Sequence, residues 1–410
     1  MNSQNQNNYW WITPYGLTIF FLIPIFCVIF IITKDKYIAN TYNFLSIKYF
    51  VIGLLYLILF AIWSFFGSRL KITQNKTRTL YIKPFFLDFL AVTTICSYFI
   101  WFGKLIFNPS LVISIFLGEG GTDGVRHYVS TTPGITTLSQ LGIIYTILYL
   151  TIFFMNSNGQ LSRRYHLYFI SILILTLFRV IAWSERLALI EVLVPLILIT
   201  VSNVNLKKFK LTFLIRYAPY LGILLLLVFF GVTEYFRSWN YYKQYYSNIV
   251  EFVLERTLNY YSTSLNNGAG IIEYATGING YFWYSLNWLY KMPLVGEFLV
   301  DILNASSPIG SFLSTYATQE YNNPSGIYII AYELSFYGGI LYVTAFGFVT
   351  GILYRSFYEK SGLGVYLYPV FFIGILEFLR LLYLSESRVF PIILFSIIGY
   401  LFFTKRKKCT

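Results

Sequence analysis

The sequence predicts an all-α polytopic integral membrane protein, and three observations support this fold class. The chain has 410 residues, of which 57% are hydrophobic and only 11% are charged, whereas about a quarter of the residues of soluble domains are charged. It offers ten apolar windows close to the length of about 20 residues that a helix needs to cross a bilayer. The connections between these windows carry their basic residues mainly on one side, which is typical of multi-pass proteins.

The predicted transmembrane helices form two groups, seven before a long polar segment and three after it. They are expected near residues 15–33, 47–66, 86–107, 138–155, 167–183, 187–203, 217–235, 326–353, 365–383 and 389–403. No basic residue precedes the first window, which is also too long for a signal peptide and lacks a small-residue cleavage site. We therefore expect it to remain as an uncleaved anchor.

Basic residues define the predicted orientation. Of the 30 Lys and Arg, 17 lie on alternate short connections and in the tail after residue 403. Positively charged loops remain in the cytoplasm, so we expect both termini on the cytoplasmic side. The net charge of +13 is then mostly a signal of topology, and the scattered basic loops give no indication of nucleic-acid binding.

Two long connections are predicted on the external side, at residues 108–137 and 236–325. Within the second, "NIVEFVLERTLNYY" has helical periodicity, and the aromatic stretch "YFWYSLNWLYKMPLVGEFLV" resembles an interfacial segment because charged residues, Pro and Gly interrupt it. The predicted organisation has three parts. Residues 1–235 form a seven-helix transmembrane part, 236–325 a large external loop with interfacial helices, and 326–410 a three-helix transmembrane part with a basic cytoplasmic tail.

The stretch "RVIAWSERLALIE", from Arg179 to Glu191, places four charges between two apolar windows. Because charge buried in lipid is costly, such a cluster indicates a function or a specific pairing. We expect a tight external hairpin here. On any continuous helix Arg179 and Arg186 would share one face, and Glu185 and Glu191 are their candidate partners. Mutual neutralisation or snorkelling at a helix end is the purely structural alternative.

Seven arginines from five separate parts of the chain are expected at or near the external face. They are Arg126, Arg179, Arg186, Arg237, Arg256, Arg380 and Arg388. A guanidinium group binds phosphate oxygens bidentately, so this set predicts a site for a polyanionic head group. Glu333 and Glu377, inside predicted helices, are expected to pair with arginines.

The sequence offers no familiar nucleophile, nucleotide-binding or metal motif. It has no G-x-S-x-G elbow, Walker loop or H-E-x-x-H sequence. The only histidines, His127 and His166, have no Cys or His neighbour at ligand spacing. The three cysteines provide no external disulfide framework. We therefore expect neither a transition-metal site nor a cofactor.

The chain resembles the bacterial oligosaccharide repeat-unit polymerases of the Wzy type, which build O-antigens and capsules. The resemblance rests on the layout as a whole, on "RVIAWSERLALIE", on "VRHYVSTTPGITTL" from Val125 and on "ERTLNYYSTSLNNG" from Glu255. It implies a GT-C-like, metal-independent glycosyltransferase of the bacterial plasma membrane that polymerises undecaprenyl-diphosphate-linked oligosaccharides at the outer leaflet. Membrane lipid, a chain-length regulator and a flippase of the same pathway are the further partners that it implies.

The resemblance, together with the charge pattern, gives a set of expected site residues. Glu185, Arg186 and Arg256 are the expected catalytic residues, with Glu185 as general base. The expected substrate-binding residues are Arg126, Arg179, Arg380, Arg388, Tyr260, Asn266 and Asn267. Glu185 could instead only orient Arg186, and the Tyr and Asn side chains could be ordinary loop or cap residues.

Two other functions remain open on the sequence alone. A ligase-like transferase that passes the glycan to another acceptor would share the same chemistry. A lipid-linked oligosaccharide flippase or transporter belongs to a different class, in which polar residues through both leaflets and repeated halves are usual. The charge gathered at one face and the lack of an internal repeat favour the polymerase.

Overall fold

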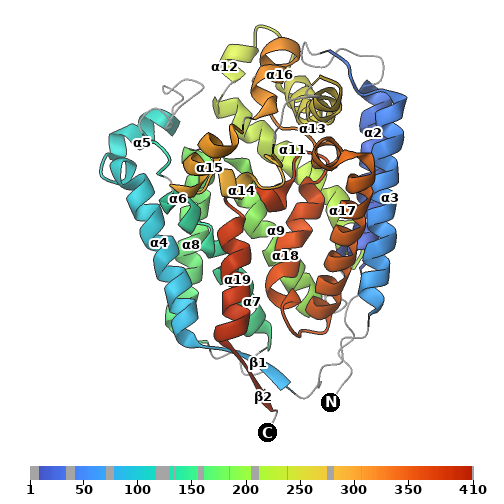
Figure 1. Ribbon diagram of the computed structural model, residues 1–410. Helices are drawn as coiled ribbons and strands as arrows, with labels where there is room; N and C mark the ends of the chain where they lie inside the picture. Colours follow the sequence, from blue (N-terminus) through green and yellow to red (C-terminus); the bar gives the residue numbers. More distant parts are fainter. Residues whose placement is uncertain are drawn as a thin grey trace.

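The computed structural model is a bundle of long helices with one two-stranded sheet at one end (Figure 1). It describes residues 9–33, 42–70, 78–116, 129–132, 134–155, 161–183, 185–204, 212–237, 239–274, 281–305, 307–318 and 320–408. Within these residues every regular element except the two strands is helical. The predicted all-α class is therefore confirmed.

The elements up to residue 237 include most of the candidate transmembrane helices. They are η1 (Trp10–Ile12), α1 (Pro14–Leu17), η2 (Thr18–Leu22), α2 (Ile23–Thr33), α3 (Ile47–Arg69), β1 (Arg78–Ile82), α4 (Pro84–Ile106), α5 (Pro109–Phe116), α6 (Ile135–Leu138), α7 (Leu141–Met155), α8 (Arg163–Ala182), α9 (Arg186–Asn203), α10 (Thr212–Arg216) and α11 (Ala218–Arg237).

The rest of the chain forms a cap of shorter helices and then returns to the bundle. Its elements are α12 (Trp239–Tyr242), α13 (Ile249–Tyr274), α14 (Asn287–Tyr290), α15 (Val295–Leu303), α16 (Pro308–Tyr316), α17 (Gly326–Tyr358), α18 (Gly364–Glu377), η5 (Tyr383–Ser385), α19 (Phe390–Phe402) and β2 (Thr404–Lys408). The helix predicted in "NIVEFVLERTLNYY" is confirmed as the first part of α13. The aromatic stretch after residue 280 contains only the short helices α14 and α15.

Seven helices of the described chain are long and apolar enough to cross a membrane. They are Pro14–Thr33, Ile47–Arg69, Pro84–Ile106, Ile135–Met155, Arg163–Ala182, Ala218–Tyr235 and Gly326–Tyr358. Three further apolar helices, Leu187–Asn203, Gly364–Glu377 and Phe390–Phe402, are shorter. Every predicted window overlaps one of these ten helices, although the window at 365–383 extends past the end of α18 at Glu377. Because three of them fall short of a typical span, ten crossings stay a prediction.

The two ends of the bundle differ in what they carry. At one end, β1 pairs with β2 in antiparallel register, with Arg78 opposite Lys408 and Ile82 opposite Thr404. This sheet was not predicted from the sequence. It joins the connection between α3 and α4 to the C-terminal tail. We call this end the strand end. Helix α19 runs from it to the other end (Figure 1), where Arg388 precedes Phe390. We call that end the arginine end.

Helices α3 and α17 pack closely along much of their length, and glycines make this approach possible. A Cβ atom added to Gly351 would lie 2.2 Å from the carbonyl oxygen of Ser64, and one added to Gly67 would lie 2.2 Å from that of Phe348. Gly347, one turn before Gly351, meets the carbonyl of Phe60 in the same way. This spacing of small residues is a common means of helix association in membranes.

Among the residues that the structure describes, Glu333 pairs with backbone groups and with no arginine, contrary to the expectation from the sequence. Its carboxylate accepts hydrogen bonds from the backbone N–H groups of Tyr284, at 2.5 Å, and Ser285, at 2.9 Å. The backbone of α17 departs from helical geometry at Ser335, where φ is 64° and ψ is 172°. The carboxylate thus ties the segment before α14 to α17 two residues before this break.

The predicted hairpin at "WSER" is present, and it separates two helices. Helix α8 ends at Ala182, Trp183 follows as its C-cap, and α9 begins at Arg186 with Glu185 as its N-cap. Arg179 and Arg186 therefore do not share the face of one continuous helix. The break turns the side chain of Glu185 toward charged partners described below.

Candidate functional site

Two arginines from separate elements converge on Glu185 at the arginine end. Arg179, in the last turn of α8, places its Nε 2.8 Å and its Nη2 2.6 Å from Oε2 of Glu185. Arg388, just before α19, forms an ion pair with Oε1 of the same carboxylate. Each oxygen of Glu185 thus faces its own guanidinium group. We call Arg179, Glu185, Glu191 and Arg388 the central cluster.

Glu191 lies in the second turn of α9 and supplies the second negative charge of the central cluster. Its side chain is 1% exposed, and its Oε1 lies 3.5 Å from Nη1 of Arg388. The hydroxyl of Tyr383 donates a hydrogen bond of 3.0 Å to the same oxygen. Two carboxylates and two guanidinium groups therefore share one buried region, which lowers the cost of removing each charge from water.

Neutral groups of α4 and the turn before α7 surround Arg179. With its amide oxygen facing the guanidinium group, Gln140 accepts hydrogen bonds of 2.7 Å from Nη1 and 2.9 Å from Nη2. The ring of Trp101 lies 5.1 Å from the guanidinium carbon, within the range of a cation–π interaction. A narrow cavity with room for about one water molecule adjoins Tyr98, Gln140, Arg179 and Glu191.

The charges of the central cluster control the ionisation of Glu185. Burial alone would raise the pKa of this carboxyl group, but the charges of Arg388 and Arg179 and their hydrogen bonds outweigh it and lower the pKa to about 2. For Arg388, burial acts to lower the pKa, and the carboxylates of Glu191 and Glu185 raise it above its usual value. Glu185 is therefore a poor base while both arginines hold it.

Arg256 forms a second cluster at the junction of α11, α13 and the segment after α16. Its Nε lies 3.1 Å from Oε2 of the buried Glu234, and its Nη2 pairs with Glu320. Three aromatic rings surround its guanidinium carbon, those of Tyr242 at 5.3 Å, Phe252 at 5.5 Å and Tyr321 at 6.0 Å. The structure thus gives Arg256 two carboxylates and an aromatic cage.

Arg380 lies between the other two clusters. Its Nε is 2.6 Å from Oε2 of Glu377, as expected for Glu377 from the sequence. The Glu377 carboxylate is close enough to interact electrostatically with Tyr261 of α13 and with Tyr383. Tyr383 also binds Glu191. Glu377 and Arg380 therefore lie close to neutral tyrosines on either side, Tyr383 toward the central cluster and Tyr261 toward α13.

The remaining predicted residues have different surroundings. Arg126 lies outside the described residues, and for Arg186 and Arg237 only the backbone, at the start of α9 and the end of α11, is described. Tyr260 packs its ring against Phe230 and Tyr321. Asn266 accepts from the backbone N–H groups of Phe44 and Leu45, and Asn267 donates to the carbonyl of Tyr321 at 2.7 Å.

Four residues of these clusters were not identified from the sequence. Gln140 and Tyr383 are common residue types with no distinguishing pattern. Glu320 lies 64 residues from its partner Arg256, so no local spacing links the two. Glu234 did carry a signal, because it is the single acidic residue near the end of an apolar run.

Comparison with known proteins adds no assignment. The chain matches no protein family, no curated protein and no solved structure. Within the described residues no group of three His, Cys, Asp or Glu side chains is placed to hold a metal ion.

Proposed function

We propose that this protein is a bacterial plasma-membrane glycosyltransferase that polymerises undecaprenyl-diphosphate-linked oligosaccharide repeat units at the outer leaflet. The proposal includes a GT-C-like fold with ten crossings and both termini in the cytoplasm. One observation carries it: two guanidinium groups from separate elements converge on one carboxylate at the end of the bundle opposite the basic strands. Guanidinium groups bind diphosphates well, and the carboxylate between them would accept the proton of an acceptor hydroxyl once a diphosphate has displaced it.

The proposed reaction replaces one carbon–oxygen bond with another and transfers one proton. The hydroxyl oxygen of the acceptor sugar forms a bond to the anomeric carbon of the donor, and the bond between that carbon and the diphosphate oxygen breaks. The diphosphate leaves with the bonding electron pair, and the hydroxyl proton passes to the carboxylate of Glu185. Arg179 and Arg388 would stabilise the negative charge that develops on the leaving oxygen, which is the task of preorganised cationic donors.

The carboxylate pairs of the central cluster constrain how the substrate would bind. Arg179 and Arg388 already have carboxylate partners, so a diphosphate must take the place of Glu185 beside them. This exchange would remove the two positive charges that lower the pKa of Glu185, while burial, which raises it, would persist. Substrate binding would thereby turn Glu185 from a poor base into a competent one.

A reconstituted assay tests the proposal. The purified protein in proteoliposomes is supplied with lipid-diphosphate repeat units, and the products are separated by size. Polymerisation gives a ladder that lengthens with time. Transfer to another acceptor gives a single addition, and transport gives no new glycosidic bond; either result would refute the polymerase.

Glu185→Gln and Glu359→Gln form a matched pair of variants for this assay. Glu359 pairs with Arg355 at the strand end, so its substitution should leave the ladder intact. Glu185→Gln should abolish it. Unchanged turnover of a normally folded Glu185→Gln protein would exclude the proposed base.

A further inference from the structure

The segment from Tyr281 to Leu303 is held at the end of α19, one of the shorter apolar helices. The ring of Trp288 in α14 stacks on Phe390, the first residue of α19, with centroids 4.2 Å apart and an interplanar angle of 3°. Lys291 Nζ lies 4.0 Å from a carboxylate oxygen of Glu386. The hydroxyl of Tyr290 donates to the carbonyl of Tyr281 at 2.7 Å. These contacts fix α14, and four residues separate its end at Tyr290 from the start of α15 at Val295.

Helix α15 has one face against the protein. Gly296 is buried, and a Cβ atom there would lie 2.1 Å from the carbonyl oxygen of Tyr290. Leu299, Val300 and Leu303 are half-buried on the same side. This face accounts for the docking of α15 but leaves more than half of its circumference exposed.

The exposed surface of α15 is divided into an apolar stripe and an acidic stripe. Val295, Phe298 and Ile302 follow at three- and four-residue steps, so they share one side of the helix. Phe298 is 63% and Ile302 62% exposed. The two acidic residues, Glu297 and Asp301, are also exposed and lie four residues apart on the adjoining side. In water the apolar stripe would remain unfavourably exposed. A helix at a membrane interface buries its apolar side in lipid and keeps its charged side in water.

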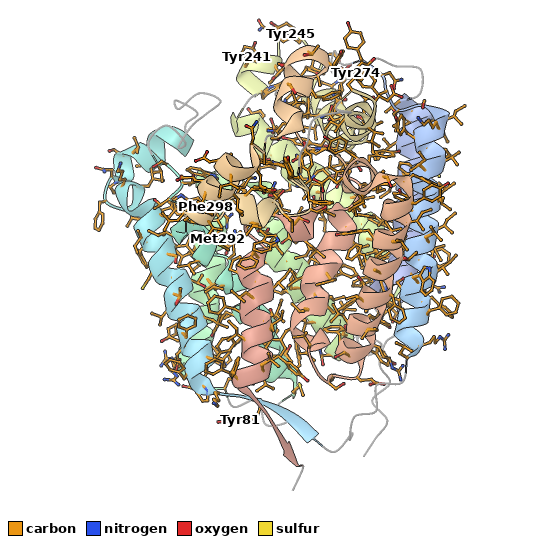
Figure 2. The ribbon with its side chains drawn as sticks, viewed as in Figure 1. Tyr81, Tyr241, Tyr245, Tyr274, Met292 and Phe298 are labelled. Carbon is orange, nitrogen blue, oxygen red and sulfur yellow. The ribbon has the colours of Figure 1, made fainter. Side chains whose placement is uncertain are left out.

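The position of α15 in the molecule matches such an interface. In Figure 2, Phe298 and Met292 lie nearer to the long helices than Tyr241, Tyr245 and Tyr274, which mark the outer edge of this end. Helix α4 rises to a similar level in this view (Figure 1). Its outer surface is strongly apolar there, with Phe99, Ile100 and Phe107 all exposed. The apolar stripe of α15 therefore lies at about the level at which the candidate transmembrane helix α4 carries an exposed apolar surface.

We propose that α15 lies in the plane of the membrane at the arginine end, with Val295, Phe298 and Ile302 in lipid hydrocarbon and Glu297 and Asp301 toward the head groups and water. The occupant of the apolar stripe is thus bilayer lipid, and neither a second copy of this chain nor another protein. This inference stands apart from the proposed catalytic activity, because it concerns a surface and not the reaction.

Spin labels on single cysteines test this placement. The three native cysteines are Cys27, Cys96 and Cys409, and Cys27→Ala, Cys96→Ala and Cys409→Ser remove them. Phe298→Cys and Ile302→Cys then probe the apolar stripe, and Glu297→Cys and Asp301→Cys probe the acidic stripe of the same helix. In liposomes, collisions of each label with oxygen, which concentrates in hydrocarbon, are compared with collisions with a water-soluble nickel complex.

The ratio of oxygen to nickel accessibility should be several-fold higher at positions 298 and 302 than at 297 and 301. Phe99→Cys on α4 supplies the reference for lipid, and Tyr245→Cys, 66% exposed, the reference for water. Equal ratios on both stripes would overturn the proposal. Protection of positions 298 and 302 from both reagents would also overturn it, because it would mean that protein covers the stripe. All four positions are exposed, so substitution there should leave folding intact.

Discussion

The two ends of the helical bundle hold their basic residues in opposite ways. At the arginine end, the side chains of Arg179 and Arg256 are 5% exposed, that of Arg380 is 18% and that of Arg388 29% exposed, and each pairs with at least one carboxylate. At the strand end, Arg164 pairs with Asp88 and Arg355 with Glu359 while remaining substantially exposed. Lys360 has no ion-pair partner among the described residues, and burial lowers its pKa.

This difference separates two uses of positive charge in one chain. Arg164 and Arg355 at the strand end keep part of their surface in water, so their ion pairs require no special geometry. At the arginine end, Arg179 and Arg256 are almost fully removed from water and given counter-charges, an arrangement that is costly unless the geometry is specific. The comparison predicts that substitutions of equal chemistry will have unequal effects at the two ends.

The largest effect on stability is expected at Arg179. Arg179→Met would leave Glu185 with one guanidinium partner instead of two and would orphan Gln140. Removing one partner of a buried ion pair costs about 3–5 kcal/mol. The free energy of unfolding, measured by denaturant titration in detergent micelles, should fall by this amount. A loss below about 1 kcal/mol would show that the central cluster is hydrated and equivalent to a surface pair.

The next largest effect is a dependence of stability on acid. Because the pKa of Glu185 is lowered to about 2 from an ordinary value of 4.5, its contribution is fully present above about pH 4.5. That contribution is lost as the pH falls toward about 2. Thermal melts of the wild type and of Glu185→Gln across this range should therefore converge at low pH. Parallel curves would mean that Glu185 is not held in its ionised form by the two arginines.

The rate of polymerisation should also differ between substitutions at the two ends. Arg388→Lys keeps the charge but loses the guanidinium fork, and loss of one charge-stabilising donor typically costs about 100-fold or more in turnover. Arg355→Lys at the strand end makes the same change away from the proposed site and should polymerise normally. The measurement is the initial rate of ladder formation in proteoliposomes. Equal rates for the two variants would show that the guanidinium group of Arg388 has no role in the reaction.

Much of this comparison could be foreseen from the sequence, because hydropathy and charge are local properties. Each apolar window became a helix, and the position of the hairpin at "WSER" was predicted correctly. Glu377 and Arg380 are three residues apart, so their pairing on one helical turn was also accessible. The grouping of Arg179, Arg380 and Arg388 at one end was also foreseen, because each lies next to a connection between apolar windows on the same predicted side.

Contacts between distant segments could not be foreseen in the same way. Glu333 binds backbone N–H groups of Tyr284 and Ser285, and backbone groups carry no sequence signal. The pairing of β1 with β2 joins residues more than 300 positions apart, and neither strand shows an alternation of apolar and polar residues. Arg256 likewise finds Glu320 only through the fold of the segment after α16.

Within the arginine end, the two partners of Arg256 should differ. The side chain of Glu234 is 0% exposed and that of Glu320 is 39% exposed. Glu234→Gln removes a buried charged partner and should cost about 1.5–3 kcal/mol of unfolding free energy. Glu320→Gln should cost about 1 kcal/mol or less. Equal losses would show that burial does not set the strength of these pairs.

The smallest effect is expected for Arg355 at the strand end. Its pair with Glu359 spans one helical turn and is partly exposed, and such pairs contribute about 0.2–0.5 kcal/mol. Arg355→Met should therefore change the unfolding free energy by no more than about 0.5 kcal/mol, and added salt should erase the difference. The same denaturant titration in detergent, repeated at low and high ionic strength, measures both. A loss of the size expected for Arg179→Met would mean that position along the bundle, and not burial with a counter-charge, decides how much an arginine stabilises this protein.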